Sequence, residues 1–133
     1  MAPYIEISSA YFARSEKDPV FLEMARRVTR MAAQTPPPDK ASLEGVAFAL
    51  NLSLDLYDLT REQTHLDDAR RYADLAIRQF WVPNPMGGLF VHEARDCYYE
   101  AKLGAGDLLA GLLRLHLRTH PNVSVPKTYD WSF

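Results

Sequence analysis

The sequence contains an internal repeat with a period of 44 residues. Residues 21–28 (Phe-Leu-Glu-Met-Ala-Arg-Arg-Val) align with residues 65–72 (His-Leu-Asp-Asp-Ala-Arg-Arg-Tyr), which superposes Leu22 on Leu66 and Ala25 on Ala69. A period of this size indicates stacked helical hairpins. It is longer than the about 34 residues of tetratricopeptide repeats and nearer the HEAT and armadillo range. The period alone therefore leaves an open solenoid and a closed ring as alternatives.

Helix signals dominate the chain and predict five helices, at residues 5–15, 18–33, 42–59, 64–81 and 100–118. Asp18 can cap the second helix, and Pro19 can occupy its first position without losing a needed N–H. Three prolines at 36–38 end that helix. Residues 64–67 resemble a capping box that would start the fourth helix at Thr64. The longest predicted connection covers residues 82–98.

The apolar pattern separates two kinds of helix. The fourth predicted helix has a single apolar stripe, made of Leu66, Ala69, Ala73, Ala76, Ile77 and Phe80. The third and fifth helices carry leucines and other apolar residues around nearly their whole circumference, so we expect them in an interior layer. Two layers follow, with helices three and five inside and helices two and four outside.

The predicted fold is all-α, with antiparallel helical hairpins in one domain over residues 1–133. The first repeat covers residues 5–34 and the second covers residues 42–81. The third inner helix covers residues 98–118, and an extended tail with several aromatic residues covers 121–133.

Composition excludes several classes of function. The net charge of −2 and the pI near 6.1 argue against the basic surface that nucleic acids require. No apolar run approaches the about 20 residues that cross a bilayer, and the N-terminus lacks the pattern of a signal peptide. Cys97 is the only cysteine, which excludes an internal disulfide. We expect a cytoplasmic protein with no membrane partner.

Several runs resemble one repeat of the α/α-toroid proteins, which include six-hairpin glycosidases, polysaccharide lyases and sugar epimerases. They are Leu-Asp-Leu-Tyr-Asp-Leu-Thr at 54–60, Leu-Asp-Asp-Ala-Arg-Arg-Tyr-Ala-Asp-Leu-Ala at 66–76, Phe-Trp at 80–81 and Gly-Gly-Leu-Phe at 87–90. The run that begins Tyr-Tyr-Glu-Ala-Lys-Leu-Gly-Ala-Gly at 98–106 is similar to the next inner helix. The resemblance implies a partial α/α toroid of about two and a half hairpins.

Complete toroids use about six hairpins, so the inner helices of this chain would need covering from outside. Helices that are apolar all round cannot be left exposed in a domain of this size. We therefore expect a homodimer or a larger protein partner.

The resemblance also implies where a substrate would lie. In α/α toroids the substrate sits at one mouth of the ring, near connections that here correspond to residues 82–99, with Glu44 and Glu100 at the starts of inner helices. Two separated carboxylates can act as general acid and base on a glycosidic bond. The candidate catalytic residues are Glu93, Asp96 and Glu100, and the candidate sugar-binding residues are His92, Tyr98, Tyr99, Lys102 and Asp107. Acidic residues at helix N-termini also favour the helix dipole without any chemistry.

Other polar groups admit simpler interpretations. The pair His92-Glu93 lacks a second histidine at metalloprotease spacing, and no cofactor or metal is predicted. His116 and His120 lie four residues apart, and we favour cations beside the last helical carbonyls over metal ligands. His65 is expected to contact water in the first turn of an outer helix. The glycines at 104 and 106 predict a turn and a close helix approach rather than a phosphate loop.

Two classes of function remain. One is a non-catalytic helical module that binds or assembles through its inner layer. The alternative is part of a glycoside hydrolase or polysaccharide lyase with a site around residues 82–107. The incomplete ring favours the module, and the cluster of polar and aromatic residues favours the enzyme.

Overall fold

The computed structural model describes residues 19–34, 42–83, 89–90 and 104–123. In chain order these contain α2 (Pro19–Gln34), α3 (Leu43–Thr60), α4 (Gln63–Phe80), β1 (Trp81–Val82), β2 (Leu89–Phe90) and α5 (Gly106–Thr119). Over these residues the fold is all-α, as predicted, with one short antiparallel strand pair. The helix predicted at residues 5–15 and most of the predicted tail lie outside the described residues.

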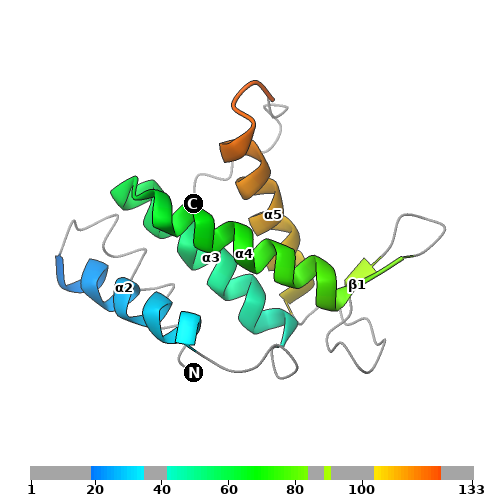
Figure 1. The fold of residues 1–133 in the computed structure, drawn as a ribbon, viewed down its shortest axis with the longest axis horizontal. Helices are drawn as coiled ribbons and strands as arrows, with labels where there is room; N and C mark the ends of the chain where they lie inside the picture. Colours follow the sequence, from blue (N-terminus) through cyan, green and yellow to red (C-terminus); the bar gives the residue numbers. More distant parts are fainter. Residues whose placement is uncertain (1–18, 35–41, 84–88, 91–103, 124–133) are drawn as a thin grey trace.

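Helix α3 lies at the centre of the described fold and contacts α2, α4 and α5 (Figure 1). Its fully buried leucines at 43, 50 and 54 join the main core with α4 and α5 residues such as Phe80 and Leu108. Leu52 and Leu56 pack instead against Ala25 of α2. Because it has buried side chains toward each of these neighbours, α3 is the interior helix that its composition predicts.

The chain reverses sharply between α3 and α4. Arg61 adopts a left-handed conformation, with φ 61°, and its N–H donates to the Tyr57 carbonyl at 2.8 Å. This arrangement satisfies one of the last carbonyls of α3 and ends the helix. At the other end of α3, the Ser42 hydroxyl caps the helix by accepting from the Gly45 N–H at 3.1 Å. Since only Arg61 and Glu62 separate them, α3 and α4 pack along each other in opposite directions (Figure 1).

The two outer helices that the repeat relates begin at Pro19 and Gln63, which are 44 residues apart. The aligned alanines Ala25 and Ala69 are both fully buried. Arg26 of α2 forms an ion pair with Glu62, with 2.5 Å between Nη2 and Oε1. The helices that align in the sequence therefore begin at equivalent residues and bury an equivalent alanine.

Helix α5 runs in the same direction as α3 and approaches it closely at two glycines. Gly104 has φ +84°, and a Cβ there would lie 2.7 Å from the Cα of Glu44. A Cβ on Gly111 would lie 2.8 Å from Cδ2 of Leu50. The close helix approach predicted for the glycine run is therefore present, and only glycine fits at 104 without strain.

Some predicted boundaries are wrong. The N-cap of α4 is Glu62, without a side-chain cap, so Thr64 does not start a capping box. Asp67 instead accepts from Gln63 and pairs with Arg70. Trp81, predicted as the last residue of the helix, instead pairs with Phe90 in the antiparallel strands β1 and β2. Part of the predicted connection 82–98 is therefore a short strand pair. The described part of α5 is Gly106–Thr119, and residues 100–103, where we predicted its start, lie outside the described part of the chain.

Two predictions of burial are also wrong. Ile77 of α4 is exposed, whereas Tyr72, which does not belong to the predicted apolar stripe, is buried. Helix α5 is not buried all round, because Leu109 and Leu113 are 55% and 44% exposed. Its other side, with Leu108 and Leu115, lies in the core. The amphipathic character of α5 follows from how it packs on α3.

Candidate functional site

Most of the predicted site lies outside the described residues. This applies to the candidate catalytic residues Glu93, Asp96 and Glu100 and to the candidate sugar-binding residues His92, Tyr98, Tyr99 and Lys102. Only Asp107 is described: its side chain is exposed in the first turn of α5, and its carbonyl accepts from the Asn51 side chain at 2.9 Å. Glu44 likewise lies in the first turn of α3. Both positions favour the helix dipole.

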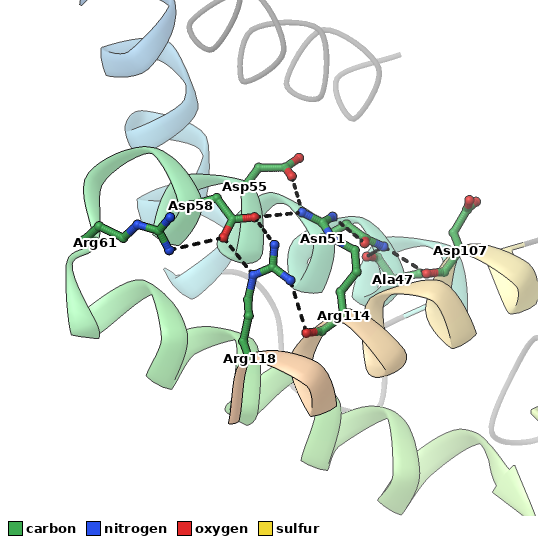
Figure 2. A network of polar contacts seen from close by, with 8 residues as sticks. All are labelled: Ala47, Asn51, Asp55, Asp58, Arg61, Asp107, Arg114 and Arg118. Carbon is green, nitrogen blue, oxygen red and sulfur yellow. Dashed lines mark hydrogen bonds and ion pairs between the residues drawn. The ribbon is translucent and has the colours of Figure 1, made fainter. Parts of the chain in front are cut away.

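A row of polar contacts joins α3 to α5 (Figure 2). We call it the polar seam, and it consists of Asn51, Asp55, Asp58, Arg114 and Arg118. Arg114 donates from Nη1 to Asn51 Oδ1 at 3.1 Å and from Nη2 to Asp55 Oδ1 at 2.6 Å. Arg118 donates to both carboxylate oxygens of Asp58, from Nε at 2.7 Å and from Nη2. These are fork-like arginine contacts, which are directional as well as strong.

The polar seam satisfies its own hydrogen-bonding groups. Both amide hydrogens of Asn51 can be used, because Nδ2 lies 3.0 Å from the Ala47 carbonyl and 2.9 Å from the Asp107 carbonyl. Hydrogen bonding to Asp58 raises the pKa of the Arg118 guanidinium. Arg61 adds a further contact to Asp58, at 3.8 Å. Since its arginines are already paired with α3 carboxylates, the seam is suited to holding two helices together.

The seam was missed in the sequence, although a signal is present. Asn51, Asp55 and Asp58 recur at spacings of four and three, which places them on one side of α3. Arg114 and Arg118 lie four apart on α5. The surrounding leucines obscured this pattern, because they made α3 look apolar all round.

The opposite side of α5 carries the exposed apolar residues. Leu109, Leu113, His116 and His120 recur at spacings of four, three and four, and all four are exposed. We call them the α5 outer face. The charged residues of α5 are Asp107, Arg114 and Arg118, and their helical positions lie on the α3 side. A helix with solvent on one side normally shows the reverse arrangement, with its charges outward.

The two histidines of this face form a stacked pair. Their ring centroids are 4.4 Å apart, with 25° between the planes. His120 ends α5: its N–H donates to the His116 carbonyl at 2.9 Å, and its Nδ1 lies 3.1 Å from the same oxygen. The predicted position beside the last helical carbonyls is therefore confirmed.

His65 is buried, so the prediction that it contacts water is wrong. Its residue is 9% exposed, and neither ring nitrogen has a hydrogen-bond partner. Its Nε2 lies 3.5 Å from Glu62 Oε2, which itself pairs with Arg26. Burial lowers the pKa of the imidazole, against the opposing effects of Glu62 and Asp68. His65 is therefore a buried imidazole beside the ion pair that links Arg26 of α2 to Glu62, the N-cap of α4.

Comparison with protein-family models, with curated proteins and with solved structures found no match. Over the described residues, no helix has the length and apolar character that crossing a membrane requires. In the same part of the chain, no three His, Cys, Asp or Glu side chains gather as ligands for one metal ion. Among the described residues, the α5 outer face combines two exposed leucines with a side of the helix that carries none of its Asp or Arg residues.

Proposed function

We propose that this chain is a helical-repeat module that assembles with a second copy of itself through the α5 outer face. The observation that carries the proposal is the orientation of α5. Its two paired arginines face α3 across the polar seam, while Leu109 and Leu113 face outward. Exposed leucines on one side of a helix are characteristic of a protein contact rather than of a wetted surface.

The spacing of the α5 outer face supports a second copy as the partner. Spacings of four, three and four are those of the contact line between two packed helices. The contact line is self-complementary, because the leucines of one copy can meet those of another, and none of its four residues is an Asp, Glu, Lys or Arg that would oppose a like charge. Burying a fully exposed leucine side chain is worth about 1.5–3 kcal/mol. Leu109 and Leu113 are about half exposed, so each would contribute a part of this, once in each copy of a twofold dimer.

The repeat supports the same proposal. In stacked helical repeats, each unit covers the apolar face that its neighbour leaves open. Helices α2 and α4 begin 44 residues apart and bury matching alanines, as such units do. The proposal includes kinship with the α/α toroids. A second copy would cover the apolar helix faces that neighbouring hairpins cover in a complete ring.

Light scattering at micromolar concentration tests the proposal. We expect the wild-type chain to dimerise and the double variant Leu109→Glu/Leu113→Glu to be monomeric, because charges would then face each other across the contact. Met24→Glu is the matched control, since Met24 is a 40% exposed apolar residue on α2. A monomeric wild type, or equal disruption by Met24→Glu, contradicts the proposal.

A further inference from the structure

We infer that His65 is a pH-sensitive group that controls the docking of α2, so that acidification releases α2 from the rest of the fold. The inference stands apart from the assembly through α5, because the residues that carry it lie on α2 and α3 and at the start of α4. Histidine is the side chain whose ordinary change of charge falls between about pH 5 and 8. A switch of this kind needs a histidine whose charge is linked to the position of one element of the fold.

The Glu62 carboxylate connects the imidazole to α2. Its Oε1 lies 2.5 Å from Nη2 of Arg26 on α2, and its Oε2 lies 3.5 Å from Nε2 of His65. His65 is buried, and neither of its ring nitrogens has a hydrogen-bond partner. A neutral ring therefore leaves the carboxylate to Arg26, which ties α2 to the N-cap of α4.

Protonation of His65 would change this arrangement. An imidazolium attracts the Glu62 carboxylate and repels the Arg26 guanidinium, so that two cations compete for one anion. Among the described residues, the charged groups that act on the ring are Glu62 and Asp68 of the α4 segment and Arg26 of α2. Burial lowers the pKa of the imidazole, Glu62 and Asp68 raise it, and Arg26 lowers it. Departure of α2 removes the repulsion from Arg26 and leaves both carboxylates.

Proton binding by His65 and docking of α2 therefore oppose each other. A group that binds a proton more tightly in the undocked state favours that state as the pH falls. Well above the ordinary pKa of 6.5 the ring is mostly neutral, and α2 docks without this opposition. A ring that titrates at this ordinary pKa when α2 is undocked can change the docking equilibrium by up to about tenfold between about pH 7.5 and 5.5.

Helix α2 is attached to the fold by a small apolar contact. Its Ala25 and Leu22 pack against Leu52 and Leu56 of α3, in a cluster separate from the main core that α3, α4 and α5 share. Figure 1 shows α2 at the edge of the described fold. An element with few buried apolar contacts opens at a lower free energy than the core does. Its release would uncover Leu52 and Leu56, which are buried when α2 is docked.

Hydrogen exchange of the full chain, followed by mass spectrometry, tests the inference. The exchange rates of the α2 amides at about pH 7.5 and 5.5, each divided by the intrinsic rate at that pH, measure the opening of α2. We expect this opening to exceed that of α3 and α4 at both pH values and to increase by about three- to tenfold on acidification. His65→Gln, which has no titratable ring, should abolish the increase. His116→Gln, at an exposed histidine of α5, is the matched control and should keep it.

Arg26→Gln tests the part that α2 itself plays. The variant removes the charge that opposes protonation, so α2 should open more at the higher pH and respond less to acidification, whereas Arg27→Gln, at the exposed neighbouring arginine, should behave as the wild type does. An opening of α2 that is equal at the two pH values, or that still rises in His65→Gln, overturns the inference. It is also overturned if the α2 amides open no more readily than those of α3 and α4, because His65 would then act only on the unfolding of the whole chain.

Discussion

Arg118 binds both carboxylate oxygens of Asp58, and this contact joins the last turn of α5 to the last turn of α3 (Figure 2). The pair is largely withdrawn from solvent, with side chains 28% and 16% exposed. Because Arg114 donates to Asp55 and Asn51 one turn earlier, the two arginines define how α5 is rotated about its axis. The same rotation directs Leu109 and Leu113 outward.

Loss of the Arg118 contact should destabilise the protein. Arg118→Met keeps an unbranched apolar side chain and removes the guanidinium, leaving Asp58 with only the longer contacts to Arg114 and Arg61. We expect the free energy of unfolding to fall by about 1–3 kcal/mol, the usual worth of hydrogen bonds to a charged group. Urea unfolding of the wild type and the variant measures this change in the free energy of unfolding.

Arg78→Met is the matched control for this variant. Arg78 lies 4.0 Å from Asp74, and both side chains are mostly exposed. Exposed pairs of this kind contribute about 0–1 kcal/mol. If both variants lose the same stability, the polar seam does not hold α5 in place.

Neither of the two glycines in the α3–α5 contact should tolerate alanine. Gly104→Ala places a Cβ against the Glu44 backbone at a positive φ, which should cost about 1–3 kcal/mol. Gly111→Ala, against the buried Leu50, should cost a similar amount, about 1–3 kcal/mol, through overpacking. Thermal unfolding of the variants checks both values.

Gly106→Ala serves as the control within the same helix. No atom lies within 4 Å of the Cβ that it would add, so alanine should be neutral or stabilising by up to about 1 kcal/mol. A destabilisation at 106 equal to that at 104 would mean that α5 does not approach α3 as described.

His65 should make stability fall on acidification. Burial lowers the pKa of its imidazole in the folded protein below the ordinary 6.5. Well above pH 6.5 the ring is mostly neutral in both states, whereas at lower pH the unfolded chain takes up a proton that the folded protein takes up only in more acidic solution. The groups around the ring are Glu62 and Asp68 of the α4 segment and Arg26 of α2. Their combined effect is smaller than that of burial.

Urea unfolding of wild type and His65→Leu at about pH 7.5 and 5.5 measures this dependence. We expect the wild type to lose more stability between the two pH values than the leucine variant, which has no titratable group at position 65. Equal losses would show that His65 is not buried as a neutral side chain.

Helix type and position could be predicted from the sequence because periodic leucines and alanines decide them locally. The buried face of α3 and most of that of α4 followed from this pattern, and the close approach at Gly104 followed from the glycines themselves. The capping box at Thr64 failed because the tight reversal at Arg61 starts α4 earlier. The position of a reversal depends on how two helices pack, which a local motif does not report.

The outward face of α5 could not be predicted, because leucine content alone does not say which leucines find a partner. Leu109 and Leu113 are as apolar as Leu108 and Leu115, yet only the second pair reaches the core. The difference comes from Arg114 and Arg118, whose partners are 59 and 60 residues away in the sequence. The predicted catalytic and sugar-binding residues from His92 to Lys102 stay predictions.

Cysteine cross-linking between copies tests the assembly through α5 most directly. With Cys97 replaced by serine, Leu109→Cys and Met24→Cys each provide one thiol, on the α5 outer face and on α2. Under mild oxidation at micromolar concentration, the account predicts a disulfide-linked dimer for Leu109→Cys and a far slower reaction for Met24→Cys. A Leu109→Cys chain that stays monomeric, or that cross-links no faster than Met24→Cys, would contradict it.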